Sequence, residues 1–328
     1  MARRKPVVVI TGASSGIGRA TALRFARKGA SVVLAGRRIA ALRSLADECE
    51  RLGATAIAVP TDVSDESAVD ALADAAVARF GRVDVWVNCA AVSFFSPIGE
   101  VPMADFRRVI DVNVLGYVHG CRAALRVMRP RRRGVIVNVS SIVGVVPQPY
   151  TSAYSMSKAA VRALGVSIRS ELRLAGETGI RISTVLPATI DTPFFSHAAN
   201  YTGRKVKAMP PVYTPERVAR TIVKQAAAPR REVAVGPMGK AMTLQHAMTP
   251  GFVEGMMAVQ VEHGHLAHTA KEPATDGNLH TPSTDPGDAR VDGGWHGRRK
   301  TATRRLLTLG LVGAGAGALA LRRRTGGA

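Results

Sequence analysis

A glycine-rich turn near the start of the chain constrains the fold more than any other feature. It reads Thr-Gly-Ala-Ser-Ser-Gly-Ile-Gly over residues 11–18, between a short apolar strand pattern and a helix pattern that continues to about residue 27. Gly12 permits the tight turn, Gly16 lets backbone N–H groups approach a phosphate, and Gly18 permits close packing of helix on strand. A second apolar strand pattern begins at Ser31, where a nucleotide-binding βαβ unit requires it.

Strand and helix patterns alternate through the rest of the first 240 residues. Further strands are expected over residues 54–60, 83–88, 134–140, 180–186 and 231–236. Further helices are expected over residues 39–52, 66–79, 103–128, 153–175 and 216–228. The alternation predicts an α/β fold, a Rossmann-type doubly wound parallel sheet in one catalytic domain, residues 1–240, with its site at the carboxyl ends of the strands.

Three residues in the second half of this domain form a set for proton transfer. Tyr154 and Lys158 are four apart in Tyr-Ser-Met-Ser-Lys, so on a helix their side chains project from one face. An ammonium beside a phenol lowers the pKa of the tyrosine, which then works as an acid near neutral pH. Ser141 follows a buried strand pattern, where its hydroxyl can hold a carbonyl oxygen. This set predicts the interconversion of a ketone and an alcohol.

The end of the second strand indicates which nicotinamide cofactor the chain uses. Sites for NAD usually place an acidic residue there, whereas this chain has Gly-Arg37-Arg38 and no carboxylate before Asp47. Because arginine can bind a 2′-phosphate through two parallel hydrogen bonds, NADP(H) is preferred over NAD(H). The alternative is that Arg37 and Arg38 only solvate the start of a helix.

With these motifs the chain resembles the short-chain dehydrogenase/reductase family over about residues 5–237. The motifs follow the family's order and spacing: residues 11–18, Asp62-Val63, Asn-Cys-Ala-Ala at 88–91, Asn113, Ser141, Tyr154, Lys158, and Leu-Pro-Ala-Thr-Ile-Asp-Thr ending at Thr192. The chain departs from the family's Asn-Ala-Gly at Cys89-Ala90-Ala91 and from its Pro-Gly at Pro187-Ala188. These departures affect the fine positioning of the cofactor and leave the chemistry unchanged.

The resemblance implies a catalytic role for four residues. Ser141 should orient the substrate, and Tyr154 should serve as the acid and base. Lys158 should bind the nicotinamide ribose and lower the pKa of the tyrosine. Asn113 should kink its helix and anchor a water molecule that links Lys158 to solvent as a proton relay.

The resemblance also implies which residues hold the cofactor. Asp62 should bind the adenine amino group, Asn88 with Ala90 should line the adenosine ribose region, and Thr192 should contact the nicotinamide carboxamide. The full expected set is Gly12, Ser14, Ser15, Gly16, Ile17, Gly18, Arg37, Asp62, Val63, Asn88, Ala90, Tyr154, Lys158, Pro187, Thr189 and Thr192.

Residues 191–214 should form a lid over the substrate, as in the family that the chain resembles. The lid carries Arg204, Lys205 and Lys207, which either meet an anionic substrate or form a solvated face. An apolar or lipid-like substrate is favoured, because the expected pocket lining is Val92, Phe94, Phe95, Val145, Val146 and Phe194.

Past residue 240 the resemblance fades. Residues 241–269 are expected to form a helical extension against the lid or a partner subunit. No metal site is expected, because no carboxylate or cysteine pattern completes the histidines of this region, His246, His263, His265 and His268. Residues 270–303 contain almost no large apolar side chains, which predicts a disordered linker.

The last segment, residues 304–324, predicts a helix that anchors the protein to a membrane. Residues 306–321 are uncharged and lie between arginine clusters, although as a helix they fall short of the roughly 30 Å hydrocarbon core. The catalytic domain is then expected on the cytoplasmic side, where NADP(H) is supplied. An interfacial or disordered tail is the alternative.

The formal net charge of +21 calls for an anionic neighbour. Nucleic acid is not expected, because the chain has no nucleic-acid motif and few aromatic residues among its arginines. The three cysteines, Cys49, Cys89 and Cys121, lack metal spacing and suit free thiols in a reducing compartment. The resemblance implies a homodimer or homotetramer.

Two functions from different classes remain. The first is an oxidoreductase acting on a small carbonyl or alcohol substrate. The second is a non-catalytic NADP(H)-binding scaffold or redox sensor at the membrane, which has no need of all four catalytic side chains.

Overall fold

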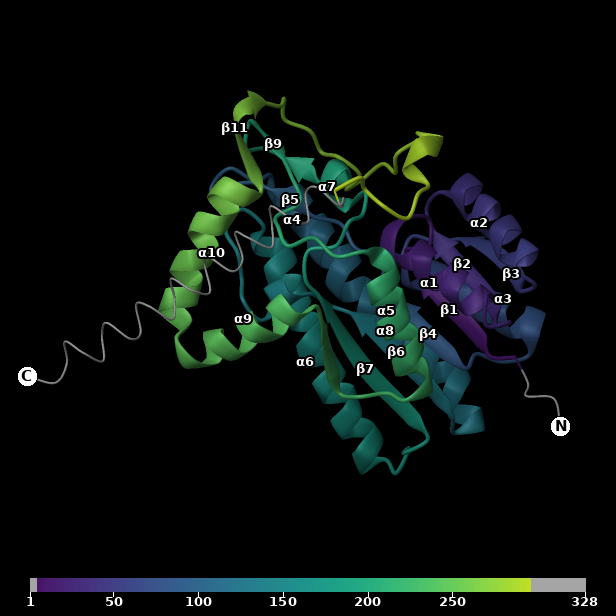
Figure 1. Cartoon of the computed structure of the whole chain (residues 1–328). Coiled ribbons are helices and arrows are strands. Elements are labelled where there is room, and N and C mark those ends of the chain that lie inside the picture. The colour runs from purple at the N-terminus through teal and green to yellow at the C-terminus, as the bar shows by residue number, and fades with distance from the viewer. Residues whose placement is uncertain (1–4, 296–328) are drawn as a thin grey trace, which may run out of the picture.

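Seven parallel strands form the central sheet of the computed structural model, which describes residues 5–295. Their order across the sheet is β10-β7-β6-β4-β1-β2-β3 (Figure 1). The strands are β1 (Val7–Thr11), β2 (Ser31–Gly36), β3 (Thr55–Pro60), β4 (Val85–Asn88), β6 (Gly134–Val139), β7 (Ile180–Pro187) and β10 (Glu232–Val235). This arrangement confirms the predicted doubly wound fold.

Helices cover both faces of the sheet, and the alternation along each strand decides which face a side chain meets. In β1, Val8 and Ile10 pack in the core with α1, α2 and α8, whereas Val9 packs in the core with α3, α5 and α6. Burial on both faces explains why the parallel strands are almost continuously apolar. The helices are α1 (Gly16–Ala26), α2 (Ile39–Arg51), α3 (Glu66–Phe80), α4 (Met103–Ile110), α5 (Gly116–Met128), α6 (Ser152–Leu174), α7 (Phe194–His197), α8 (Pro215–Ala227), α9 (Pro237–Met248) and α10 (Pro250–Gly264).

The strand order reverses between β1 and β4, and this reversal places the site. Strands β2 and β3 follow on one side of β1, and β6, β7 and β10 follow on the other side of β4. The loops after β1 and β4 therefore diverge and leave a crevice at the carboxyl ends of the strands. The glycine-rich turn after β1 and residues 89–92 after β4 both line this crevice.

The long helix expected over residues 103–128 is interrupted. Residues Asp111–Leu115 form a π-helical turn between α4 and α5. Single π-helical turns inside α-helices are frequently found at functional sites. Asn113 lies within this turn, in agreement with the kink that the family resemblance implies.

The helical extension exists, as a hairpin rather than one helix. Helices α9 and α10 meet at Thr249, and Pro250 begins the second helix. Strand β11 (Leu266–Lys271) then pairs antiparallel with β9 (Arg204–Val206) of the lid. Two further short strands, β5 (Phe94–Phe95) and β8 (Ala199–Asn200), join the lid to the loop after β4.

The expectation of a disordered linker is wrong for the described part of residues 270–303. Thr275 and Asn200 exchange two backbone hydrogen bonds, of 2.8 and 3.0 Å. From there the chain passes over the carboxyl ends of the strands to α1 and α2, as the yellow end of the ribbon in Figure 1 shows. Residues 275–295 are called the strap below. Leu279 within it is fully buried.

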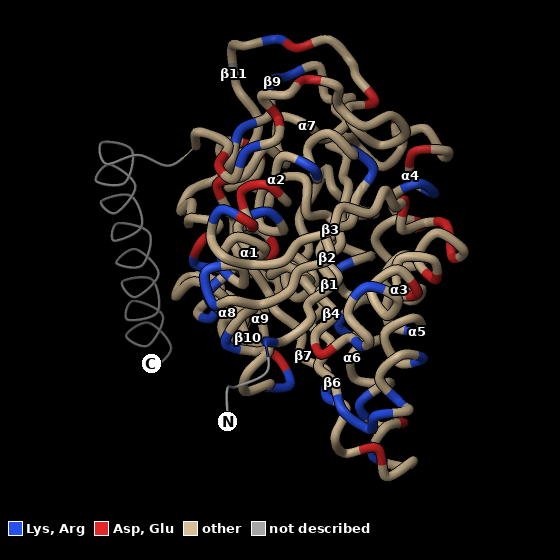
Figure 2. The backbone as a smooth tube through the Cα atoms, turned by 90° about the vertical axis from the view of Figure 1, so that its right-hand side faces the viewer, with Lys and Arg blue, Asp and Glu red and all other residues tan. Residues whose placement is uncertain are grey.

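The expected membrane helix, residues 304–324, lies outside the described residues. Within residues 5–295, no helix is both long enough and apolar enough to cross a membrane. Figure 2 shows acidic residues interspersed with the lysines and arginines of this part. In the basic loop before β6, Arg129 pairs with Glu177 and Arg131 pairs with Asp84. Part of the basic excess is thus neutralised locally.

Candidate active site

A cavity of about 910 Å³ occupies the crevice at the carboxyl ends of the strands. It extends from the glycine-rich turn and Arg37, past Tyr154 and Thr192, to the α9–α10 hairpin. Of the residues expected to be catalytic or to bind the cofactor, all line this cavity except Asn88 and Asn113. The sequence motifs therefore converge on one site.

The glycine-rich turn has the shape that a pyrophosphate requires. Gly12 has a φ of +67°, and a Cβ there would lie 2.7 Å from the Cα of Ala90. A Cβ on Gly18 would lie 2.2 Å from the carbonyl oxygen of Gly12, so both positions exclude side chains. Ser15, at the start of α1, makes no side-chain cap, and the first turn of that helix carries no acidic residue. The positive end of α1 therefore lies at the cavity without a side-chain anion, which suits a phosphate, although the Gly16 amide donates to the Arg290 carbonyl oxygen in this structure.

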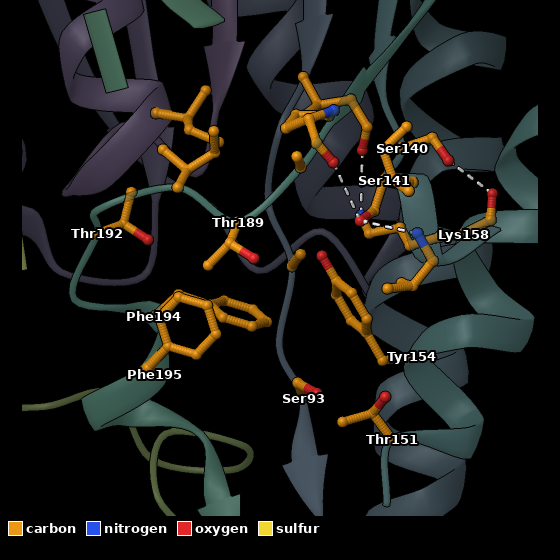
Figure 3. Close-up of a pocket in the computed structure, with 18 of the residues that line it drawn as sticks. Ser93, Ser140, Ser141, Thr151, Tyr154, Lys158, Thr189, Thr192, Phe194 and Phe195 are labelled. Atoms are coloured by element: carbon orange, nitrogen blue, oxygen red, sulfur yellow. Dashed lines mark hydrogen bonds between the residues drawn. The ribbon is translucent and has the colours of Figure 1, made fainter. Parts of the chain in front are cut away.

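Helix α6 presents Tyr154 and Lys158 to the cavity from one face, as their spacing predicts. Figure 3 shows the Tyr154 hydroxyl turned toward Ser141 and Lys158, with Phe194 across the cavity. The rings of Tyr154 and Phe194 are 5.3 Å apart between centroids. Ser141 lies just beyond β6, where its Oγ donates to the carbonyl oxygen of Pro187 at 3.4 Å. The three residues predicted for proton transfer thus share one wall.

Lys158 is buried beneath this wall, with 1% of its surface exposed. Its Nζ donates to the carbonyl oxygen of Val139 at 3.1 Å and to the Tyr117 hydroxyl at 3.3 Å. Burial disfavours the charged ammonium and lowers the pKa of Lys158 to about 8. Near neutral pH the ammonium is still the major form.

The pKa of Tyr154 differs from the sequence-based expectation. Burial raises it well above its usual value, and a hydrogen bond with Ser141 acts in the opposite direction. The Lys158 ammonium, 5.4 Å from the centre of the Tyr154 ring, is directed to Val139 and Tyr117 instead. In this arrangement Tyr154 is therefore a protonated acid, and the expected lowering by Lys158 is not realised.

Asn113 holds the π-helical turn against the loop after β4. Its Oδ1 accepts from the Val92 amide at 2.9 Å, and its Nδ2 donates to the Val92 carbonyl oxygen at 2.8 Å and to the Ser157 Oγ at 3.2 Å. These contacts fix the position of α6 relative to β4. The water relay to Lys158 stays a prediction.

Asn88 does not line the adenosine region as expected. Its side chain is buried, accepts from the Trp86 indole at 2.8 Å and donates to Asn138 Oδ1 at 2.9 Å. A Cβ on Gly120 of α5 would lie only 2.1 Å from the Asn88 Oδ1. The asparagine therefore links β4 to β6 and α5 within the core.

Arg37 and Asp62 lie together at the adenosine end of the cavity. The Asp62 carboxylate accepts from Ser64 and from Arg108, at 2.6 Å for the latter. Burial raises the pKa of Asp62, but the hydrogen bonds from Arg108 and Ser64 outweigh it and hold the pKa below its usual value. The Arg37 guanidinium donates to backbone carbonyls of the strap. Its pKa is lowered, because burial opposes the charge more strongly than Asp62 supports it.

The expected apolar lining is correct for Val92, Phe95 and Phe194 only. Phe94 packs in the core, 6.1 Å from the Phe106 ring. Val145 and Val146 pack against α10 rather than facing the cavity. Sequence reasoning missed the apolar side chains that the α9–α10 hairpin and Met209 of the lid contribute to the cavity lining. Those of the hairpin are Met238, Met242, Leu244, Met248, Phe252, Met256 and Met257.

Two small polar residues beside Tyr154 were also missed. Ser93 and Thr151 both line the cavity, and both are buried (Figure 3). The Thr151 Oγ has no hydrogen-bond partner among the described residues. Its place three residues before Tyr154, at the start of α6, was the available signal. Both hydroxyls can meet a polar group of a substrate.

The basic residues of the lid, Arg204, Lys205 and Lys207, are not among the residues that line the cavity. Arg204 pairs with Glu262 at 2.7 Å. This favours the solvated-face interpretation. His265 lines the cavity between Phe95 and Phe195, and burial lowers its pKa to about 4.

Comparison with known proteins agrees with this geometry. Residues 6–201 match the family described as short chain dehydrogenase. The oxidoreductase YxnA of Bacillus subtilis is 35% identical over 325 residues, which are 97% of this chain and 90% of that protein. The 3β-hydroxysteroid dehydrogenase 1 of Eggerthella lenta is 39% identical over 188 residues, 57% of this chain and 71% of that protein. The cis-4-hydroxycyclohexanecarboxylate dehydrogenase of Sinomonas cyclohexanicum is 39% identical over 220 residues, 66% of this chain and 87% of that protein.

Solved structures are similar over most of the fold. A short-chain dehydrogenase/reductase from Burkholderia phymatum in complex with NAD has a TM-score of 0.70 at 30% identity, covering 76% of this chain and 95% of that one. An alcohol dehydrogenase from Thermococcus sibiricus complexed with 5-hydroxy-NADP has a TM-score of 0.62 at 27% identity, covering 71% and 96%. With its sheet, glycine-rich turn and Ser-Tyr-Lys wall, the chain therefore belongs to the short-chain dehydrogenase/reductase family and is an oxidoreductase of CH–OH groups.

Proposed function

We propose that this enzyme interconverts a ketone or aldehyde and an alcohol, with NADP(H) as the redox partner and Ser141, Tyr154, Lys158 and Asn113 as its catalytic residues. One observation carries the proposal: the wall that holds Ser141 and Tyr154 lines the same cavity as the glycine-rich turn. Nucleotide and substrate can therefore meet at one place. The rival function, a non-catalytic scaffold, has no use for a protonated tyrosine facing that cavity.

The roles of the side chains follow from their positions. The nicotinamide, when bound, supplies or accepts the hydride. In the reductive direction Tyr154 donates its proton to the substrate oxygen, and Ser141 donates a hydrogen bond to the same oxygen. The Lys158 ammonium lies 5.4 Å from the centre of the Tyr154 ring, and we propose that it turns from Val139 and Tyr117 toward the phenolate oxygen that forms and stabilises its charge. Asn113 positions α6 through its contact with Ser157.

NADP(H) is proposed over NAD(H) because Arg37 and Arg38 line the cavity after β2. The variant Arg37→Asp should lower the ratio of kcat/KM for NADPH to kcat/KM for NADH by about 10- to 100-fold, since it removes a charge-assisted contact and adds repulsion. The ratio is the useful quantity, because a general disturbance of the site affects both cofactors alike. Arg43→Asp, the same charge change at an exposed position of α2, is the matched control. Equal use of both cofactors by the parent enzyme would contradict the proposal.

An apolar substrate is proposed because the α9–α10 hairpin forms one end of the cavity. Leu244, Met248 and Phe252 line the cavity and are 64%, 68% and 54% exposed, so its mouth is apolar. Complete burial of such a side chain is worth about 1.5–3 kcal/mol, so covering the exposed part of each against a substrate stabilises the complex by about 1–2 kcal/mol. Two similar proteins are named for a 3β-hydroxysteroid and for cis-4-hydroxycyclohexanecarboxylate. Both names support an alicyclic or lipid-like alcohol.

A panel of ketones and alcohols of increasing apolar size, run with NADPH or NADP⁺, tests this proposal. We expect kcat/KM to rise with apolar size. Phe252→Ser should lower kcat/KM by about tenfold for a large apolar ketone and leave a small one almost unchanged. Val259→Ser is the control, because Val259 is 59% exposed on the same helix but is not among the cavity-lining residues. Equal losses in the two variants, or with both ketones, would exclude this role of the hairpin.

We propose further that residues 304–324 attach the enzyme to a membrane, with the catalytic domain on the cytoplasmic side. The support is the sequence pattern, an uncharged run over residues 306–321 between arginine clusters. The full-length protein should sediment with membranes, whereas a chain ending at Gly297 should stay in the supernatant and remain active. Full-length protein in the supernatant without detergent would contradict attachment.

A further inference from the structure

The strap crosses the cavity at its adenosine end, and the lid holds it at both sides. At its start, Thr275 is paired with Asn200 through the two backbone hydrogen bonds described above. At its end, the amides of Gly293 and Trp295 donate to one carboxylate oxygen of Asp191, at 3.0 and 2.7 Å. Between these two attachments the segment runs from the lid to α1 and α2 and back (Figure 1), and three of its residues line the cavity.

The middle of the strap is bound to the nucleotide-binding half of the fold. The Arg37 guanidinium donates to the backbone carbonyls of residues 278, 279 and 280, at 2.6, 3.1 and 3.0 Å. The Arg108 Nε donates to the Leu279 carbonyl oxygen at 2.9 Å, and the Leu279 side chain is fully buried in the core. His280 contacts the Asp105 carboxylate at 2.8 Å.

The last part of the strap lies over the start of α1. The Gly16 amide donates to the Arg290 carbonyl oxygen at 2.9 Å, and Arg38 donates to the Asp288 carbonyl oxygen at 3.0 Å. The Asp288 side chain contacts His197 of α7 at 2.9 Å. The strap therefore joins the lid to the elements expected to hold the adenosine and the phosphates.

Despite these contacts the strap does not fill the cavity. Asn278, Pro282 and Ser283 line it, and so do Gly16 and Arg37, which are hydrogen-bonded to the strap. The strap thus forms part of the wall of the cavity of about 910 Å³. The matched family region ends at residue 201, so the strap is an addition to that region.

We propose that the strap is the outer wall of the cofactor site, and that it must detach from Arg37 and from the lid before the cofactor can enter or leave. This inference rests on the proposed use of a nicotinamide cofactor. A closed wall retains bound cofactor, because release then requires the hydrogen bonds to Arg37 and the buried contacts of Leu279 to break first.

Substitutions that force the strap off its contacts, made in the full-length protein and called the wedge variant below, can test the proposal without altering the glycine-rich turn or the Ser-Tyr-Lys wall. Gly277 has a φ of +55°, and a Cβ there would lie 2.3 Å from the His197 carbonyl oxygen. Gly277→Val combined with Leu279→Asp should therefore detach the strap. Gly287→Ala is the matched control within the strap, because its Cβ would meet only the Asp285 side chain, at 3.1 Å.

The rate of NADPH release, measured by stopped-flow fluorescence during a chase with excess NADP⁺, is the main readout. We expect release to become about tenfold faster or more in the wedge variant and to stay within about twofold of the parent in Gly287→Ala. An unchanged rate in a folded wedge variant overturns the proposal. Tighter binding of NADPH by that variant also overturns it, since the strap would then be a plug that competes with the cofactor.

Hydrogen exchange on the unmodified full-length protein gives a second test that needs no variant to fold. The amides of residues 277–293 should exchange about tenfold more slowly with saturating NADPH than without nucleotide. Equal exchange rates with and without NADPH would overturn the proposal that the strap is the outer wall of the cofactor site. If the unmodified protein bound neither NADPH nor NADH, the proposed function would fall as well. If the protein bound the nucleotide but the exchange rates of the strap amides did not change, the proposed role of the strap would be wrong and the proposed function would stand.

Discussion

Tyr154→Phe should lose about 10²- to 10⁴-fold in kcat with a responsive ketone, because general acid–base groups contribute that much. The substitution removes only the hydroxyl, and the ring keeps its packing against Phe194 at 5.3 Å. Cofactor affinity and the melting temperature should therefore stay close to those of the parent. The measurement is steady-state turnover together with nucleotide binding.

A second tyrosine offers a matched control for this change. The Tyr150 hydroxyl donates to Glu262 at 2.9 Å, and Tyr150 is not among the cavity-lining residues. Tyr150→Phe removes the same group and should leave kcat within about twofold. Parent-like turnover by Tyr154→Phe would eliminate Tyr154 as the proton donor and would leave the scaffold function as the better reading.

Lys158→Met should inactivate the enzyme while making its cofactor-free form more stable. Activity should fall by about 100-fold or more, because the phenolate loses the cation that stabilises it. Stability should rise because a buried ammonium gives way to an apolar side chain of similar length. The Val139 carbonyl oxygen keeps a donor after the change, since the Tyr117 hydroxyl donates to it at 2.8 Å.

The size of the gain follows from the pKa of Lys158. Its ordinary value is 10.5 and its value in the fold is about 8, which corresponds to about 3 kcal/mol at most near neutral pH. For a domain of this size we expect about 2–4 °C in melting temperature per kcal/mol. Lys224→Met, at an exposed position of α8, should change stability by no more than about 0.5 kcal/mol.

The gain in stability from Lys158→Met should decrease as the pH rises. Below pH 8 the lysine is charged in both the folded and the unfolded parent, so the cost of burying the charge is fully present. Between pH 8 and 10.5 the unfolded parent binds more protons than the folded one, and its free energy of unfolding rises with pH. The advantage of Lys158→Met should therefore shrink across this window. A constant difference in chemical denaturation from pH 6 to 10 would show that Lys158 carries no such cost.

The sequence identified the parts of the protein that depend on short-range order. The strand, glycine-rich turn and helix at residues 7–26 are encoded by neighbouring residues, because apolar period and glycine placement are local. The four-residue spacing of Tyr154 and Lys158 places both on one helix face wherever that helix packs. Ser141 joins them because parallel strands end at a common edge. For these reasons the fold class and the Ser-Tyr-Lys wall could be predicted.

The apolar lining could not be predicted, because composition does not distinguish a core residue from a pocket residue. Phe94 and Phe95 are adjacent and chemically identical, yet Phe94 packs in the core and Phe95 lines the cavity. The pleat of the short β5 strand, set by its pairing with β8, decides between them. Asn88 shows the same limit, since only the approach of Gly120 reveals that it faces the core.

The strap shows what the tertiary structure alone decided. Its few large apolar residues predict disorder, because such a segment cannot bury enough surface to offset the entropy of ordering. In the fold it is held through its backbone: carbonyls of residues 278–280 accept from Arg37, and amides of residues 293 and 295 donate to Asp191. Every residue carries these backbone groups, so composition cannot signal them. The sequence by itself determined the class of reaction and the nucleotide-binding fold, whereas contacts between residues more than 100 positions apart decided where the strap lies.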